Sequence, residues 1–277
     1  MVRYKIFYFL VSVISWLFGQ KVYLEDHNSQ NFIDYPDRTW RLVPFPDFKG
    51  NLYNHDNLAT VNRHNFLEDE RFNNARQLAE SRWMNNNNKY VRNITWRLHT
   101  ALWGASVALN NGIEDAIFVE CGTGRGFMAA GITSYFNFDE LHRPDFYLVD
   151  IFSDVLHDVS GDVLKPADFA YTEDVEEVKE YFSKYSSVKV KQGLIPDCLT
   201  EIPDQPISFL HIDLNSAFAE AAALEKLKDR LCKGSLILFD DYGGPGGEEQ
   251  ALVHDAFAIN NNRDLLSLPT GQAVIIW

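Results

Sequence analysis

Apolar residues recur along most of the chain in two alternating patterns. Short apolar runs are typical of buried strands, and apolar residues that return every three or four positions are typical of helices. The apolar runs that predict strands are 116–119, 146–149, 207–212 and 235–239, and the alternating stretch 188–191 predicts one more. The stretches that predict helices are about 127–137, 175–185, 216–232 and 248–259. Strands that alternate with helices in this way predict a doubly wound α/β sheet that is mostly parallel, with helices on both faces.

The C-terminal end departs from this alternation. Two short apolar runs, 265–268 and 273–276, follow each other with only a Pro-Thr-Gly turn between them. A connection this short joins antiparallel neighbours, since a parallel pair needs a crossover of a dozen or more residues. We therefore expect an antiparallel strand at one edge of the sheet.

The N-terminal part is organised differently. Residues 1–20 hold an apolar segment, residues 21–89 read as an irregular arm followed by a helical extension, and residues 90–277 form the α/β domain. Helical spacing appears at 65–83, where Phe72, Ala75 and Ala79 share a face, and again at 90–110. These boundaries are our predicted domain division.

The apolar segment at 6–18, preceded by Arg3 and Lys5, has the outline of a secretion signal but is followed by no small-residue cleavage site. It is too short for a bilayer span, which needs ~20 residues. Three interpretations stay open: a signal peptide, a membrane-surface anchor through residues 4–18, and a helix that docks on the protein or on a second subunit. We favour docking in a homo-oligomer.

Composition excludes several classes of protein. The net charge of −14 comes without a basic stripe, which argues against a nucleic-acid partner. The three cysteines are scattered and form no CxxC pair, so neither a disulfide framework nor a zinc ribbon is supported. Reduced thiols are the expectation for a cytoplasmic protein.

A glycine-rich turn follows the first predicted strand of the α/β domain. It reads Glu120-Cys121-Gly122-Thr123-Gly124-Arg125-Gly126 and leads directly into a predicted helix. Glycines let the backbone pass close to a ligand, and a helix N-terminus offers free N–H groups. Asp150, at the end of the next strand, is placed to take the hydroxyls of a ribose. Because Glu120 would repel a pyrophosphate, the turn favours a positively charged cofactor such as S-adenosylmethionine.

Three further carboxylates follow two later strands. Asp213 ends the run at 207–212, and Asp240 and Asp241 end the run at 235–239. The carboxyl ends of parallel strands meet at one edge of the sheet, so these side chains should converge there. Converging carboxylates repel each other unless a cation neutralises them, and Mg²⁺ prefers such oxygen ligands. The sequence therefore predicts a magnesium site, with helix or loop capping by one aspartate as the alternative.

These elements together resemble the macrocin O-methyltransferase family. The resemblance covers about residues 90–277 and rests on three segments: Phe118-Val119-Glu120-Cys121-Gly122, Leu210-His211-Ile212-Asp213, and Gly234-Ser235-Leu236-Ile237-Leu238-Phe239-Asp240-Asp241-Tyr242. It implies a Rossmann-like, S-adenosylmethionine-dependent enzyme that methylates sugar hydroxyls with Mg²⁺.

The resemblance also implies roles for single residues. Glu120, Gly122 and Gly126 would line the methionine part of the cofactor, Asp150 would bind its ribose, and Asp213, Asp240 and Asp241 would hold the metal. We add Cys121, Thr123, Gly124 and Asp213 to the cofactor-binding candidates. A histidine base is implied after the second strand, where His157 is nearest, so His157 and Asp213 are the catalytic candidates.

The chain also departs from the family pattern. Asn215 and Ala217 replace the Asp and Tyr expected after Asp213, and the glycine turn has its own spacing. The expected function is an O-methyltransferase acting on a hydroxyl of a sugar or glycosylated small molecule. Two alternatives remain: a metal-dependent hydrolase or hydroxylase on the same scaffold, and a non-catalytic oligomeric assembly protein.

Overall fold

The computed structural model describes residues 53–56, 58–60, 62–83, 93–138, 144–152, 156–157, 163–164, 174–244 and 247–277. The chain divides into two compact units, one formed by residues 1–53 and 59–62 and the other by residues 54–58 and 63–277. The apolar segment at 1–20 and the arm up to residue 52 lie outside the described residues, so their proposed roles and the predicted domain boundaries stay predictions. The second unit carries the features described below.

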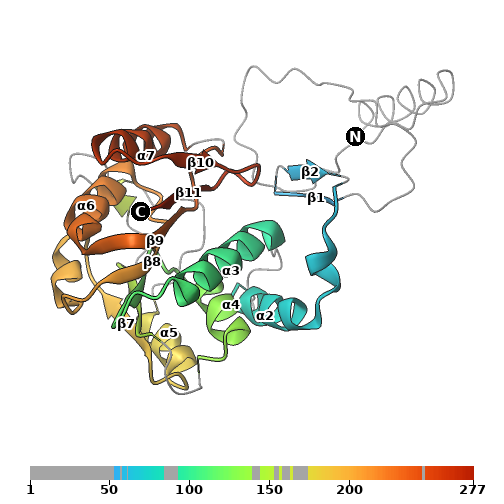
Figure 1. The fold of residues 1–277 in the computed structure, drawn as a ribbon. Coiled ribbons are helices and arrows are strands. Elements are labelled where there is room, and N and C mark those ends of the chain that lie inside the picture. The colour runs from blue at the N-terminus through green and yellow to red at the C-terminus, as the bar shows by residue number, and fades with distance from the viewer. Residues whose placement is uncertain are drawn as a thin grey trace, which may run out of the picture. The chain divides into compact units, whose positions relative to one another are not determined.

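A seven-stranded sheet forms the centre of this unit (Figure 1). Its strands lie in the order β10-β11-β9-β8-β3-β4-β7. The parallel members are β3 (Ile117–Cys121), β4 (Phe146–Asp150), β7 (Val188–Gln192), β8 (Ile207–Ile212) and β9 (Leu231–Phe239). The antiparallel members are β10 (Leu265–Ser267) and β11 (Ala273–Ile276). The predicted α/β sheet with an antiparallel edge is confirmed.

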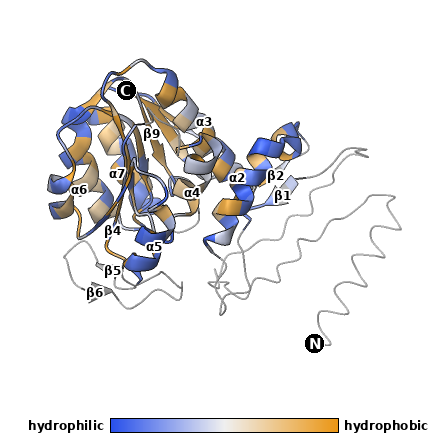
Figure 2. Ribbon diagram, turned by 90° about the horizontal axis from the view of Figure 1, so that it is seen from below, coloured by the Kyte–Doolittle hydropathy of each residue, from blue (hydrophilic) through white to orange (hydrophobic). Residues whose placement is uncertain are grey.

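Helices cover both faces of the sheet. On one face α3 (Thr95–Asn110), α4 (Phe127–Tyr135) and α5 (Val175–Phe182) share an apolar core with the strands, and α2 (Glu70–Ser81) packs on α4. On the other face lie α6 (Ala217–Leu227) and α7 (Glu248–Asn260). Figure 2 shows the apolar strands between these layers, with α2 and α5 coloured mainly as hydrophilic. Short elements complete the chain: β1 (Tyr53–His55), β2 (Leu58–Thr60), η1 (Asn65–Glu68), β5 (Leu156–His157), β6 (Val163–Leu164), η2 (Asp197–Glu201) and η3 (Lys228–Arg230).

The alternation of side chains along each strand explains both cores. Phe118 in β3 and Phe209 in β8 face α3 and α4, whereas their neighbours Val119 and Leu210 face α6 and α7. Both sets are fully buried, as a parallel sheet covered on two sides requires. This is why the strands read as continuous apolar runs in the sequence.

Two details of the helices bear on the sequence predictions. The helix expected at 216–232 ends at Leu227, and β9 already begins at Leu231, which pairs with Ile207 of β8. Here pairing within the sheet prevails over local helical spacing. In α2 the predicted stripe of Phe72, Ala75 and Ala79 is buried, as expected. Within the described residues, no helix combines the length and the apolar character that a bilayer crossing requires.

Candidate active site

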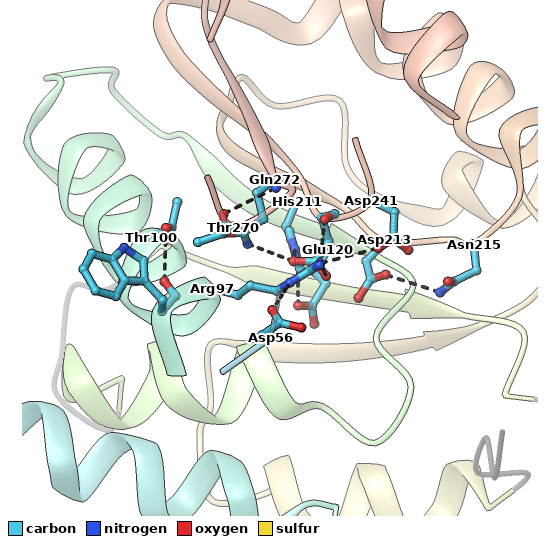
Figure 3. A network of polar contacts seen from close by, with 12 residues as sticks. Asp56, Arg97, Thr100, Glu120, His211, Asp213, Asn215, Asp241, Thr270 and Gln272 are labelled. Atoms are coloured by element: carbon cyan, nitrogen blue, oxygen red, sulfur yellow. Dashed lines mark hydrogen bonds and ion pairs between the residues drawn. The ribbon is translucent and has the colours of Figure 1, made fainter. Parts of the chain in front are cut away.

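A row of polar side chains crosses four adjacent strands at the carboxyl edge of the sheet (Figure 3). Glu120 of β3 and His211 of β8 are partners in the strand register, and Nδ1 of His211 lies 2.9 Å from Oε1 of Glu120. Nε2 of His211 lies 3.9 Å from Oδ1 of Asp240, which follows β9. Gln272, just before β11, donates from Nε2 to the same oxygen over 2.8 Å. The row joins positions that the sequence separates widely.

Burial gives this row unusual electrostatics. Burial alone would lower the pKa of His211, but the carboxylates of Asp240 and Glu120 raise it to about 10. Burial raises the pKa of Glu120, and the contact with His211 opposes this shift. His211 is therefore an imidazolium at neutral pH and acts as the counter-ion between two buried carboxylates.

Arg97 reaches the same edge from α3. Its Nη1 donates to the backbone oxygen and to Oδ2 of Asp240, both over 2.7 Å, and lies 3.4 Å from Oδ1 of Asp241. Its Nε donates to Oδ2 of Asp56 over 2.6 Å. Burial would lower the pKa of Arg97, but Asp240, Asp56 and Asp241 together raise it above its ordinary value. Burial would raise the pKa of the Asp240 carboxyl group, but the nearby charge of Arg97 is the main cause that lowers it below its ordinary value.

Asp213 lies at the edge of this cluster and next to the glycine turn. Its backbone N–H donates to the carbonyl of Cys121 over 2.8 Å, and its Oδ1 accepts from Nδ2 of Asn215 over 3.3 Å. Partial burial raises the pKa of Asp213 well above its ordinary value, and the carboxylates of Asp240 and Asp241 raise it further. Asp213 is thus a residue of intermediate exposure whose carboxyl group has a raised pKa.

The glycine turn between β3 and α4 has a backbone that only glycine adopts easily. Gly122 has φ of 93°, and a Cβ there would lie 1.8 Å from the backbone oxygen of Asp213. Gly124 has φ of 51° and donates its N–H to Oδ2 of Asp150 over 2.7 Å. Oδ1 of Asp150 accepts from the N–H of Phe152. Asp150 therefore fixes the turn while lying beside it, and burial raises its pKa although these N–H groups oppose the shift.

Comparison with protein families identifies this arrangement. The model of the macrocin O-methyltransferase family matches residues 62–262. The chain belongs to the macrocin O-methyltransferase family. It is an S-adenosylmethionine-dependent O-methyltransferase, as this family assignment indicates. No curated protein matches the sequence.

Two solved methyltransferase structures have the same fold as this chain. The O-methyltransferase NovP is 15% identical, with a TM-score of 0.59 over 74% of this chain and 97% of its own. The calicheamicin methyltransferase CalS11 is 16% identical, with a TM-score of 0.53 over 78% of this chain and 95% of its own. At these identities the two structures show that the fold is shared.

The residues of the glycine turn fit S-adenosylmethionine. Oε2 of Glu120 is buried and accepts no hydrogen bond of ordinary geometry in the described part of the chain, and the hydroxyl of Thr123 lies close to the Glu120 carboxyl group. A buried acceptor of this kind matches a ligand that brings an ammonium group, because an unpaired buried carboxylate oxygen is costly. Oδ1 and Oδ2 of Asp150 each accept one backbone N–H and keep further lone pairs for hydroxyl donors.

The structure does not support the magnesium site expected at Asp213, Asp240 and Asp241. In the part of the chain that the structure describes, no three His, Cys, Asp or Glu side chains are arranged to hold a metal ion. Asp240 has partners within the chain, since its Oδ2 accepts from Arg97 and its Oδ1 accepts from Gln272. A cation is needed beside converging carboxylates, and the guanidinium of Arg97 contributes part of that positive charge.

The remaining predicted residues lie at different places. The side chain of Cys121 is packed in the core under α6, where burial raises the pKa of its thiol, so only its backbone borders the turn. Gly126 precedes α4 with φ of 83°, and a Cβ there would meet the ring of Phe182. The backbone of His157 lies in β5, but its side chain is outside the described set, so its catalytic role stays a prediction.

Three residues of the site were missed from the sequence: Asp56, Arg97 and Gln272. Arg97 is a charged residue on the apolar side of a predicted helix, since its neighbours Leu98 and Ala101 are buried with it. A buried arginine needs carboxylate partners, so an arginine at this position could have indicated a buried ion pair. Asp56 and Gln272 stand in short connecting segments with no pattern that distinguishes them.

Proposed function

We propose that this enzyme transfers a methyl group from S-adenosylmethionine to a hydroxyl group of a sugar or glycosylated small molecule. The observation that carries the proposal is the contact of Asp213 with the glycine turn, 2.8 Å from its backbone N to the oxygen of Cys121. This contact brings a carboxyl group of raised pKa next to the turn that suits the methyl donor. The sugar as acceptor is supported by the family and by CalS11, described as a TDP-rhamnose 3′-O-methyltransferase.

Each residue has a distinct task in this proposal. Glu120 binds the positively charged end of the cofactor, and His211 holds the Glu120 carboxylate in place through its 2.9 Å contact. Asp150 binds the ribose hydroxyls and fixes the turn through Gly124. When bound, S-adenosylmethionine supplies a methyl group on a positively charged sulfur.

Asp213 is the proposed general base. A base must accept the hydroxyl proton as the oxygen attacks, and a carboxylate with a raised pKa does so more readily than an ordinary one. Asp213 is partly exposed, so an acceptor hydroxyl can reach it. The proposal assigns the proton transfer to Asp213 and includes no metal step.

The direct experiment uses S-adenosylmethionine with a deuterated methyl group and TDP-rhamnose as the first acceptor, followed by a set of glycosides. Mass spectrometry of the products reports whether a labelled methyl group has been added to an acceptor oxygen. Transfer by the wild type and its loss in Asp213→Asn support the proposal. Equal transfer by wild type and Asp213→Asn contradicts the role of Asp213, and transfer to amines alone contradicts the O-methyltransferase assignment.

A further inference from the structure

Asp56 lies outside the segment that matches the family, yet its side chain enters the candidate active site. The family match begins at residue 62, and Asp56 follows β1 in the N-terminal extension. Its side chain is only 4% exposed, and its Oδ2 accepts from Nε of Arg97 over 2.6 Å. A contact this short between two buried, oppositely charged groups is a charge-assisted hydrogen bond.

The guanidinium of Arg97 connects Asp56 to the two aspartates after β9. Nε is used by Asp56, whereas Nη1 holds the carboxylate and carbonyl of Asp240 and lies near Asp241. Because the guanidinium is planar and rigid, fixing Nε fixes the direction in which Nη1 points. Asp56 thereby sets the orientation of the whole contact with Asp240 and Asp241.

Two glycines lie next to this guanidinium. A Cβ at Gly271 would lie 3.4 Å from Nη2 of Arg97, and one at Gly244 would lie 3.9 Å from it. The loops that carry them are joined, since the N–H groups of Tyr242 and Gly243 donate to the carbonyl of Gly271 over 2.9 and 2.7 Å. The segment after Asp241 is therefore packed around the guanidinium that Asp56 holds.

We propose that Asp56 is a positioning residue of the methyl-acceptor site, which acts through Arg97 to hold the Asp240–Asp241 segment beside Asp213. The role in an acceptor site rests on the proposed function. The positioning of Arg97 by Asp56 does not depend on it. It makes Asp56, which precedes the segment matched by the family, part of the active site. Loss of the Asp56 charge weakens the hydrogen bond from Nε, and the guanidinium is then drawn toward the remaining carboxylates.

The test compares the wild type with Asp56→Asn, Asp56→Glu and a control, Asp69→Asn. Asp69 caps α2 by accepting from the N–H of Phe72 and has no contact with Arg97 in the described residues. The first readout is the side-chain Nε–Hε signal of Arg97 in ¹H–¹⁵N spectra, assigned with Arg97→Lys. The second is the hydrogen exchange of the amides of Asp240, Tyr242 and Gly243.

We expect Asp56→Asn to shift the Arg97 signal and to speed up exchange of these amides, whereas Asp56→Glu stays close to the wild type and Asp69→Asn leaves both unchanged. With TDP-rhamnose, or the acceptor that replaces it, we expect kcat to fall ~10–100-fold in Asp56→Asn, since a misplacement of about 1 Å costs that much. Affinity for S-adenosylhomocysteine should stay within about twofold, because Asp56 does not touch the glycine turn.

The proposal is overturned if Asp56→Asn gives the wild-type Arg97 signal and exchange rates, or if Asp69→Asn produces the same changes. The spectroscopic readouts require no acceptor. A wild type that binds no S-adenosylhomocysteine would therefore contradict the proposed function and leave the test of Asp56 intact.

Discussion

Glu120 and His211 face each other across neighbouring strands, with Nδ1 of His211 2.9 Å from Oε1 of Glu120 and both side chains buried. The pair connects the glycine turn with the cluster of charged residues around Arg97. Glu120 borders the glycine turn, and His211 reaches toward Asp240, which belongs to the cluster around Arg97. A change in either residue should therefore affect both ligand binding and the stability of the sheet edge.

Replacing Glu120 by glutamine tests the proposal that its negative charge faces the cofactor. Hydrogen bonds to charged groups contribute ~1.5–3 kcal/mol, so S-adenosylhomocysteine should bind ~10–100-fold more weakly. Isothermal titration calorimetry measures this loss. The control is Glu114→Gln, an exposed residue that precedes β3 and should bind like the wild type. Equal affinity in Glu120→Gln and Glu114→Gln would remove Glu120 from the cofactor site.

Replacing Asp213 by asparagine should have opposite effects on activity and stability. Methyl transfer should fall by ~10²–10⁴-fold, since a general base contributes that much. The raised pKa of Asp213 means that the folded state disfavours its carboxylate. That cost is absent at low pH and appears as the pH rises from the ordinary value of an aspartate through the raised one. At pH 8 Asp213→Asn should therefore unfold at a higher temperature, by ~2–4 °C for each kcal/mol gained.

Calorimetric scans of Asp213→Asn and of the exposed-site control Asp229→Asn measure this effect. The control should show the wild-type midpoint. A lower midpoint for Asp213→Asn than for Asp229→Asn would contradict the repulsion between Asp213 and the aspartates after β9.

Replacing Gly122 by alanine tests the close approach of the glycine turn to Asp213. A Cβ at this position would lie 1.8 Å from the oxygen of Asp213, which is backbone and must move. We expect binding of S-adenosylhomocysteine to weaken at least ~10-fold, because a shift of this size displaces the turn. Gly112→Ala is the matched control, since Gly112 also has a positive φ of 75° but no atom within 4 Å of the added Cβ. Similar binding by both variants would show that the close approach is unimportant.

The pH dependence of stability should reveal the buried imidazolium. The pKa of His211 is raised from its ordinary value of 6.5 to about 10, so its pairing stabilises the fold fully below pH 6.5. This contribution is lost as the pH rises toward 10. Urea unfolding at pH 6.5, 8 and 9.5 should give a decreasing free energy of unfolding for the wild type and a flatter profile for His211→Gln. Parallel profiles would mean that His211 is neutral in the folded protein.

Much of the fold follows from the order of residues alone. Strands buried on both faces require continuous apolar runs, and β3, β8 and β9 lie where those runs occur. Acids at the ends of neighbouring parallel strands must meet at one edge, so the common location of Glu120 and Asp213 could be expected. Local pattern fails where tertiary pairing decides, as at Leu231, where a strand begins inside a predicted helix.

The charge balance of the site could not be predicted in the same way. Arg97 and Asp240 are 143 positions apart, and their contact depends on how α3 crosses the sheet. Asp56 lies in an extension without periodicity, so nothing in its neighbourhood indicated a buried partner. The sequence located the carboxylates but not the guanidinium that contacts Asp240 and lies near Asp241.

Binding of S-adenosylhomocysteine to the wild type and to Asp150→Ala, followed by calorimetry with and without Mg²⁺, tests the central claim most directly. The account predicts saturable binding by the wild type that is independent of Mg²⁺, because Glu120 and Asp150 provide the contacts. It predicts at least ~10-fold weaker binding by Asp150→Ala, since the variant loses the ribose contact and the bond to Gly124. No heat with the wild type, or equal affinities for the two proteins, would contradict it.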